Sequence, residues 1–182
     1  MAVQMRPLSI QDMPLLHEWL NQTHLRPFYE REPSTLEQVV KRYACRVADD
    51  HRTKCLIAEF DGAPFGYLQW YLNRSFPEYG IDTIGMSDGV SIDYYIGDPA
   101  LLGQRLGSAM LNAAVEHVKP LVRSKDRSFC VGHRPENTSA IRCSQRAGFT
   151  YRKDFLEYGL AHELYVRDEG GLVACIFETD LK

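Results

Sequence analysis

A strand-like run followed by a glycine-bearing loop and an amphipathic helix is the feature of this sequence that best predicts chemistry. Residues 90–96 have the composition of a strand, and the loop after them carries Gly103 and Gly107. Leu106 and Met110 then begin an apolar helix face. Glycines at such a junction let the backbone approach a ligand, and the unpaired amides of the first helical turn point at an anion. No Gly-Lys-Ser/Thr triplet occurs in the chain, so the pattern predicts a pyrophosphate cradle without a Walker lysine.

A second strand-and-helix unit follows the first. Residues 128–131 read as a strand, Asn137 is placed to cap a helix, and Gly148 stands where that helix would end. Ala140 and Ile141 lie on its apolar face. This second unit strengthens the interpretation of the first as a ligand-binding loop, because a glycine turn before a helix is weak evidence when it stands alone.

The order of these motifs resembles the GNAT acyltransferase superfamily and, more narrowly, the aminoglycoside 6′-N-acetyltransferases. The matching segments stand in family order from residue 6 to residue 168 and so cover nearly the whole chain. They are Glu18-Trp-Leu-Asn21 with His24, Asp61-Gly-Ala-Pro-Phe-Gly-Tyr-Leu-Gln-Trp-Tyr71, Gly89-Val90 with Ile92-Asp93, Leu102-Gly-Gln-Arg-Leu-Gly107, and Ala140-Ile-Arg-Cys143 with Ala147-Gly-Phe149. Each motif is moderately specific, and five in order make the resemblance strong.

The resemblance implies a fold of the α/β (α+β) class, the GNAT fold. Its central sheet is mixed and mostly antiparallel, with helices on both faces, and the sheet splays apart to hold acyl-CoA. We assign residues 1–168 to this acetyltransferase domain. Residues 169–182 form a C-terminal extension, which the sequence leaves open as a further strand, a tail or a dimer contact.

The remaining sequence predicts the other elements of such a sheet. The expected elements are a first strand at residues 3–6, a helix capped by Asp12, a helix opening with the capping box Ser34-Thr-Leu-Glu37, a hairpin of strands 55–60 and 65–72 turning at Asp61-Gly62, a long irregular loop at 73–88, and strands near 149–156 and 162–167 joined at Tyr158-Gly159.

Composition excludes several classes of function. The 182 residues, 45% hydrophobic and 25% charged, suit one globular domain. A net charge of −3 without a basic stripe argues against nucleic-acid binding. No apolar run approaches the roughly 18 residues of a membrane span, and no signal peptide opens the chain. Five scattered cysteines without a Cys-x-x-Cys pair indicate reduced thiols in the cytoplasm and no metal site. Monomer and homodimer both remain open.

The resemblance implies that acetyl-CoA is the co-substrate. The backbone of Tyr94, Tyr95 and Ile96 would pair with the pantetheine as an added strand does. The pyrophosphate would lie against the loop and the two helix starts, a set comprising Gly103, Gln104, Arg105, Leu106, Gly107, Ser108 and Asn137. The family pattern Gln/Arg-x-x-Gly-x-Gly/Ala is broken here by Leu102 and Arg105. Arg105 either adds a charge-assisted bond to a phosphate or lies in solvent.

Asp93 is the predicted catalytic base. By resemblance it matches the aspartate of the family's Ile-Asp pair, and an aspartate flanked by apolar residues is costly to bury unless it has a partner. The alternative is an outward-facing aspartate on a half-exposed strand. In the functional interpretation, Asp93 holds the ammonium group of the acceptor and takes its proton, directly or through a water.

Two departures from the family concern catalysis and the acceptor. Ser144 stands where many GNAT enzymes have a tyrosine that protonates the leaving thiolate, so Ser144, a water or another tyrosine would serve. Gly132 stands where the aminoglycoside enzymes have an aspartate that grips the sugar. His133 follows it, either as a second base or as a capping or solvent histidine.

Two loops carry the residues expected to bind a cationic amine. Aromatic and acidic side chains alternate there, as a hydroxyl-rich scaffold with several ammonium groups requires. The predicted acceptor residues are Phe28, Tyr29, Glu78, Tyr79, Asp82, Asp88 and Asp93. The opposing interpretation is that the acidic loop residues are simply solvated.

The leading hypothesis is an acetyl-CoA-dependent N-acetyltransferase that modifies an aminoglycoside-type antibiotic and so confers resistance. The modified amine is the 6′ amine by resemblance, or another such as 2′, given Gly132. A second hypothesis is acylation of a siderophore precursor such as hydroxylysine, or of a protein or peptide amine. The third is a non-enzymatic CoA-sensing module.

Overall fold

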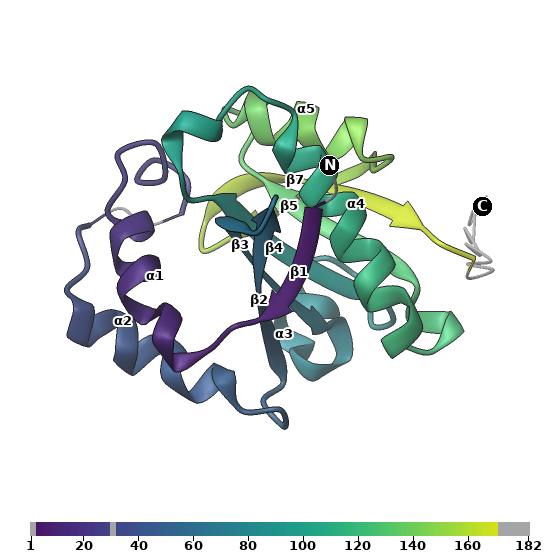
Figure 1. Cartoon of the computed structure of the whole chain (residues 1–182). Coiled ribbons are helices and arrows are strands. Elements are labelled where there is room, and N and C mark those ends of the chain that lie inside the picture. The colour runs from purple at the N-terminus through teal and green to yellow at the C-terminus, as the bar shows by residue number, and fades with distance from the viewer. Residues whose placement is uncertain (1–2, 30–31, 171–182) are drawn as a thin grey trace, which may run out of the picture.

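A seven-stranded sheet with helices on both faces forms the centre of the molecule (Figure 1). The computed structural model describes residues 3–29 and 32–170. The strand order is β1-β2-β3-β4-β5-β7-β6. All neighbours run antiparallel except β4 and β5, which are parallel. The predicted mixed, mostly antiparallel sheet is therefore confirmed.

The strands and helices follow the predicted order along the chain. The strands are β1 (Val3–Pro7), β2 (Thr53–Phe60), β3 (Ala63–Leu72), β4 (Val90–Ile96), β5 (Ser128–His133), β6 (Thr150–Glu157) and β7 (Leu160–Asp168). The α-helices are α1 (Met13–Leu20), α2 (Leu36–Tyr43), α3 (Pro77–Gly80), α4 (Leu106–Val118) and α5 (Thr138–Arg146). The 3-10 helices are η1 (Ile10–Asp12), η2 (Ala44–Val47), η3 (Asn73–Ser75), η4 (Pro99–Leu101), η5 (Lys119–Leu121) and η6 (Ser124–Asp126).

Two predictions, the loop at residues 73–88 and the domain boundary at residue 168, can be compared with the structure. The segment at residues 73–88, expected as an irregular loop, contains the short helices η3 and α3. The expected boundary at residue 168 falls at the end of β7, and the Glu169 amide still donates to the Arg127 carbonyl at 2.9 Å. The remainder of the predicted extension, residues 171–182, lies outside the described residues.

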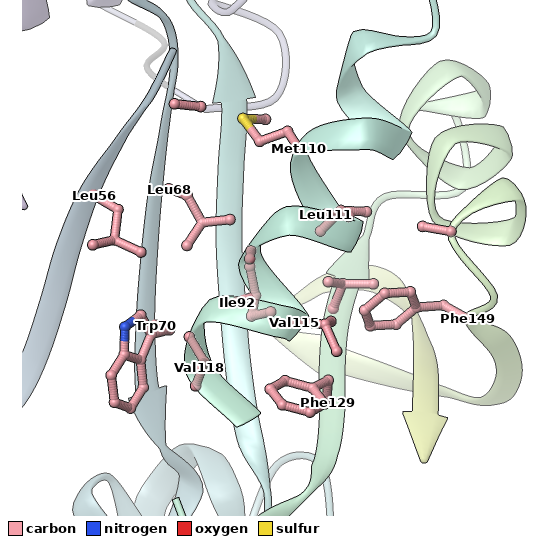
Figure 2. Close-up of a cluster of buried hydrophobic side chains, with 14 of the residues drawn as sticks. Leu56, Leu68, Trp70, Ile92, Met110, Leu111, Val115, Val118, Phe129 and Phe149 are labelled. Carbon is pink, nitrogen blue, oxygen red and sulfur yellow. The ribbon is translucent and has the colours of Figure 1, made fainter. Parts of the chain in front are cut away.

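The two faces of the sheet carry separate hydrophobic clusters. On one face, Met110, Val115 and Val118 of α4 pack against strand side chains that include Ile92 and Phe129 (Figure 2). These α4 residues recur at helical spacing, so a single stripe of the helix is buried. Residues of α1 and α2 form the second cluster with Ile57, Tyr67 and Tyr95; these helix residues are Met13, Leu16, Trp19, Leu20, Val39 and Tyr43.

Both tight hairpins adopt the turn that their sequences predict. Asp61 and Gly62, which join β2 to β3, have φ angles of 50° and 81°. Tyr158 and Gly159, which join β6 to β7, have φ angles of 49° and 75°. Positive φ at both central residues matches the right-handed twist of the flanking strands.

The start of α2 lies one residue later than predicted. Thr35, not Ser34, caps the helix: its side chain accepts from the Gln38 amide at 3.3 Å, and Gln38 Oε1 accepts from the Thr35 amide at 2.7 Å. Both backbone groups of Ser34 are instead bonded to the side chain of Asn21. This contact with α1 fixes Ser34 outside the helix, so the predicted Ser34-x-x-Glu37 box is wrong.

Asp12 does not cap α1 through its side chain. Its carboxylate accepts from the Ser9 amide and hydroxyl, both at 2.8 Å, and pairs with the Arg6 guanidinium at 2.8 Å. The capping box therefore belongs to η1, which precedes α1. The pairing with Arg6 holds the pKa of this buried carboxyl below its usual value, although burial alone would raise it.

The strands β4 and β5 part soon after they begin to pair. Their parallel register contains Val90 opposite Phe129 and Ser91 opposite Cys130, and goes no further. Beyond Ser91, β4 remains paired with β3 up to Ile96, and β5 remains paired with β7 up to His133. The second half of β4 therefore presents backbone groups toward β5 without a strand partner.

The indole of Trp19 packs directly on the backbone that follows β4. A Cβ atom added at Gly97 would lie 2.0 Å from Trp19 Cδ2. Only a residue without a side chain fits there, so this contact holds α1 close to the end of β4. Trp19 also meets the Tyr95 ring edge-on, with 6.4 Å between ring centroids.

We predict that Gly97→Ala lowers the free energy of unfolding by about 3 kcal/mol, because the new methyl group overpacks the indole. Urea denaturation measures the change. Trp19→Leu by itself should also lower stability, because it leaves a cavity. The double variant Trp19→Leu with Gly97→Ala should lose less stability than the sum of the two single variants. Additive losses in the double variant would show that the two residues do not constrain each other.

Candidate active site

A cavity of about 680 Å³ opens where β4 and β5 part. Its walls come from the loop after α1, from β4, from the start of α4, from β5 and α5, and from the end of β6 and the start of β7. Segments distant in the sequence therefore meet at the parting of the sheet. This is the place where the sequence predicts that acyl-CoA binds.

One end of the cavity gathers most of the residues predicted to bind the cofactor. The residues that line it from this set are Tyr94, Tyr95, Ile96, Gly103, Arg105, Leu106, Gly107, Ser108 and Asn137. Gln104 does not line it; its side-chain amide donates to the Ala100 carbonyl at 2.9 Å. Asn137 caps α5 as predicted, accepting from the Ala140 amide at 3.2 Å.

Arginines surround the same end of the cavity. Arg105 precedes α4, and Arg142 and Arg146 project from α5. Arg134, which follows β5, also lines the cavity, but it lies toward the loop after α1, where it donates to the Pro27 carbonyl at 3.0 Å. The sequence analysis singled out only Arg105, because Arg142 and Arg146 lie far from the glycine loop in the chain. Together with the free amides at the start of the 13-residue helix α4, they make an electropositive site suited to a phosphorylated ligand.

Asp93 lies in the cavity wall, on β4. Gln69 of β3 donates from Nε2 to its Oδ2 at 2.7 Å. Burial raises the pKa of Asp93, and the hydrogen bond from Gln69 and the charge of Arg46 oppose that rise. A carboxyl group with a raised pKa inside a cavity is suited to proton transfer near neutral pH.

Glu157 and His162 also line the cavity, and the sequence analysis missed both. Their side chains face each other at 3.8 Å across the β6–β7 hairpin. Burial raises the pKa of Glu157, and the charge of Asp93 raises it further. The available signal was that Glu157 directly precedes the Tyr158-Gly159 turn, but the expected strand ended one residue earlier.

Ser144 does not occupy a position from which it can contact a substrate. It is fully buried and does not line the cavity. Its hydroxyl lies 2.7 Å from His133 Nε2 and 3.2 Å from the hydroxyl of Tyr94. Of these three side chains, Tyr94 and His133 reach the cavity wall. The expectation that Ser144 meets the leaving thiolate therefore needs correction.

His133 is poorly suited to act as a second base. Burial, assisted by the nearby His162, lowers the pKa of His133 to about 4. The ring is neutral at physiological pH and would bind a proton only weakly. Its hydrogen bond with Ser144 favours a structural part in the wall, and its action as a second base stays a prediction.

Gly132 has no room for a side chain. A Cβ atom there would lie 2.9 Å from Phe155 Cζ and 3.6 Å from the Tyr79 hydroxyl. An aspartate at this position, which the resemblance suggested, would require the Phe155 ring to shift. Glu157, two residues after Phe155 on the same strand, supplies a carboxylate from a neighbouring part of the wall.

The predicted acceptor residues divide into two groups. Phe28 and Tyr29 line the cavity, but Glu78, Asp82, Asp88 and Tyr79 do not. Glu78 and Asp82 are exposed, and Asp88 pairs with Lys125 at 2.8 Å.

The position of the 77–88 segment follows from one buried anchor. Ile84 is packed against Cys130, Leu164 and Val166. The Tyr79 ring packs edge-on against Phe155, behind Gly132. The acidic side chains of this segment therefore point away from the cavity, which corrects the expectation for Glu78, Asp82 and Asp88.

Metal clusters, membrane-spanning helices and disulfides were also sought in the described part of the chain. Within residues 3–29 and 32–170, no cluster of His, Cys, Asp or Glu has a metal-binding arrangement, and no helix has the length and apolar character to cross a membrane. Cys45, Cys55, Cys130 and Cys143 are free thiols. Cys175 lies outside the described residues.

A family model described as an acetyltransferase (GNAT) domain matches residues 9–156. The chain belongs to the GNAT acetyltransferase family. The aminoglycoside N(6')-acetyltransferases type 1 of Klebsiella pneumoniae and Serratia marcescens are each 28% identical to it over 162 residues, covering 81% of this chain and 74% of the relative.

Solved structures of acetyltransferases share the fold. Aminoglycoside acetyltransferase AAC(6')-Ib in complex with coenzyme A and kanamycin aligns with a TM-score of 0.76 at 25% identity, over 92% of this chain and 95% of that one. RimL, a ribosomal L7/L12 alpha-N-protein acetyltransferase, aligns with a TM-score of 0.73 at 16% identity, over 93% of this chain and 96% of that one. The second likeness shows the fold alone.

The backbone conformation of Arg105 explains why the GNAT loop pattern has a glycine at this position. This arginine stands where the pattern has its first glycine, and its φ is +63°, in the left-handed region that favours glycine. Gly107 meets a different constraint, since a Cβ atom there would lie 2.8 Å from Cys143 Sγ on α5. This GNAT protein therefore tolerates a strained side chain at one position of the loop and retains glycine at the other.

We predict that Arg105→Gly raises the free energy of unfolding by about 1 kcal/mol, because glycine removes the left-handed strain. Arg105→Ala keeps that strain and serves as the matched control. If the guanidinium binds a phosphate, both variants should weaken acetyl-CoA binding equally in calorimetry. Unequal acetyl-CoA affinities of the two variants, or equal stabilities, would contradict the idea that the backbone strain affects stability while the guanidinium charge affects binding.

Proposed function

We propose that this GNAT protein is an acetyl-CoA-dependent N-acetyltransferase that modifies an amino group, the 6′ amine, of an aminoglycoside-type antibiotic and so confers resistance. The observation that carries the proposal is a single cavity with arginines and free helix amides at one end and the carboxylates of Asp93 and Glu157 in its wall. The curated relatives named aminoglycoside N(6')-acetyltransferases support the choice of acceptor.

The cofactor end of the cavity suits the parts of acetyl-CoA. The freed backbone groups of β4 provide donors and acceptors for the amides of the pantetheine arm. The amides at Gly107 and Ser108, at the start of α4, suit the pyrophosphate. Arg105, Arg142 and Arg146 supply positive charge to the phosphate groups.

The carboxylate pair suits an acceptor with more than one ammonium group. Asp93 and Glu157 are partly buried, and the charge of Asp93 raises the cost of ionising Glu157, so both carboxylates are stabilised when cations bind beside them. The rings of Phe28 and Tyr29, which line the same cavity, provide surfaces against which a sugar ring can pack. Aminoglycosides combine several amines with such rings, and acetylation removes one positive charge and its hydrogen-bond donors.

The chemistry assigns distinct parts to two neighbouring residues of β4. Asp93 holds the reacting ammonium group and takes its proton as the nitrogen attacks the thioester carbonyl. The Tyr94 side chain lies on the opposite face of the strand, with its hydroxyl beside Ser144 and 3.4 Å from the Ala140 carbonyl of α5. This tyrosine is the candidate that replaces the missing α5 tyrosine and protonates the departing thiolate.

The direct test is incubation with acetyl-CoA and a panel of aminoglycosides, with release of free thiol as the signal. We expect turnover of at least one member, with mass spectrometry and NMR showing an acetylated 6′ amine. Asp93→Asn should lower kcat/KM about 100-fold or more, because a neutral amide cannot accept the proton. Asp88→Asn, which changes a carboxylate outside the cavity, should leave kcat/KM unchanged. Turnover of hydroxylysine or a peptide amine, with no aminoglycoside accepted, would refute the proposed acceptor.

A second pair of variants tests the acid. Tyr94→Phe should lower kcat about 10-fold or more with little change in the KM for acetyl-CoA, because only the leaving group loses its proton donor. Ser144→Ala should have a smaller effect, since the serine contacts the Tyr94 hydroxyl and His133 but does not line the cavity. Equal losses in both variants would assign the effect to packing of the wall and remove Tyr94 from the mechanism.

A further inference from the structure

A chain of polar contacts runs from η2 through β3 to the predicted base on β4. Arg46 Nη1 of η2 donates to Gln69 Oε1 at 2.7 Å, and Gln69 Nε2 donates to Asp93 Oδ2 at 2.7 Å. The hydroxyl of the buried Tyr67 lies 2.9 Å from the same Gln69 oxygen. Neither Arg46 nor Gln69 lines the cavity, so both act on a ligand only through Asp93.

The arrangement leaves the Gln69 side chain one favourable orientation. Its oxygen faces two donors, the Arg46 guanidinium and the Tyr67 hydroxyl, and its amide nitrogen faces the carboxylate. A flipped amide would place N–H groups against the guanidinium and an oxygen against Asp93, so two attractive contacts would become repulsive. Arg46 therefore selects which end of Gln69 meets Asp93.

Arg46 is itself held in place by an aromatic ring. Its guanidinium carbon lies 5.0 Å from the centroid of the buried Tyr43 ring. Half-buried behind β3, the cation is partly shielded from solvent, so its field acts on the sheet more strongly than that of an exposed arginine. Arg42 lies over the same ring at 5.5 Å but is exposed.

We propose that Arg46, acting through Gln69, is a positioning residue that orients the Asp93 carboxylate toward the acceptor and keeps it ionised. This inference rests on the proposed function only for the identity of the base. Removal of Arg46 leaves Gln69 free to flip and removes the nearby positive charge. Asp93 then loses a hydrogen bond to its charged form, and its pKa rises further above its usual value.

Other groups facing Asp93 do not take over this part. Tyr29, Tyr71 and Tyr79 surround it from the loop after α1, from β3 and from α3, and burial raises the pKa of each, so all three are neutral. Glu157, paired with His162, adds negative charge and opposes ionisation of Asp93. Arg46 is the cation whose charge lowers the pKa of Asp93.

The test compares Arg46→Met with Arg42→Met, which removes a cation from the same ring without touching Gln69. The Asp93 carboxyl carbon is titrated by NMR in each full-length variant and assigned with Asp93→Asn. We expect Arg46→Met to raise the pKa of Asp93 by about 0.5 to 1 unit, with Arg42→Met close to the unsubstituted protein. In the kcat/KM profile with an accepted aminoglycoside, the acidic limb should move upward by a similar amount while the KM for acetyl-CoA stays unchanged.

An unchanged pKa of Asp93 in folded Arg46→Met would overturn the proposal. If that variant does not fold, Gln69→Met provides the second arm, because it removes the bridge and should raise the same pKa. Arg46→Lys should restore the charge but only part of the orientation, giving an intermediate pKa. The titration needs no acceptor. A shifted pKa of Asp93 without aminoglycoside turnover would therefore reject the proposed function but support the positioning of Asp93 by Arg46 through Gln69.

Discussion

The short parallel pairing of β4 and β5 is the constraint on which the rest of this structure depends. Two residue pairs hold the strands together, and beyond them each strand remains bound to its other neighbour while the two diverge. The divergence creates the cavity, frees the backbone edge of β4, and leaves the start of α4 and the adjoining α5 beside the opening. Packing on both sheet faces supports this divergence. Side chains of α4 belong to the cluster on one face, and on the other face Trp19 packs against Gly97 and holds the end of β4 in place.

Electrostatics then divides the cavity into two chemical regions. Arginines and helix amides at one end favour phosphate groups, whereas Asp93 and Glu157 favour ammonium groups. Each carboxyl has a raised pKa because of burial, so each gains from a cation that enters beside it. The same burial lowers the pKa of His133 to about 4, which keeps that ring neutral in the wall. This arrangement lets a GNAT protein bind a polyanionic acetyl donor and a cationic acceptor in one cavity, next to strand β4.

Sequence patterns predicted best what local interactions decide. The caps and turns at Asn137, Asp61-Gly62 and Tyr158-Gly159 depend on residues within a few positions of each other, and the structure has them as expected. The start of α2 was misplaced by one residue, because a side chain 13 positions away binds Ser34. Arg46 could not be predicted, since only the folded sheet brings it near Asp93, and the place of Glu157 before the Tyr158-Gly159 turn did not indicate that it lies near Asp93. Acidic residues of the 77–88 segment were assigned to the site from composition, and the buried Ile84 turns that segment elsewhere.

The central claim is that one cavity holds both partners of an acetyl transfer with the reacting amine at Asp93. A crystal structure of the protein with coenzyme A and kanamycin tests it most directly. The account predicts the pyrophosphate at the start of α4, the 6′ amine within about 3 Å of the Asp93 carboxylate, and a second ammonium group beside Glu157. Kanamycin bound elsewhere, or its 6′ amine turned away from Asp93 and from the coenzyme A sulfur, would contradict the account.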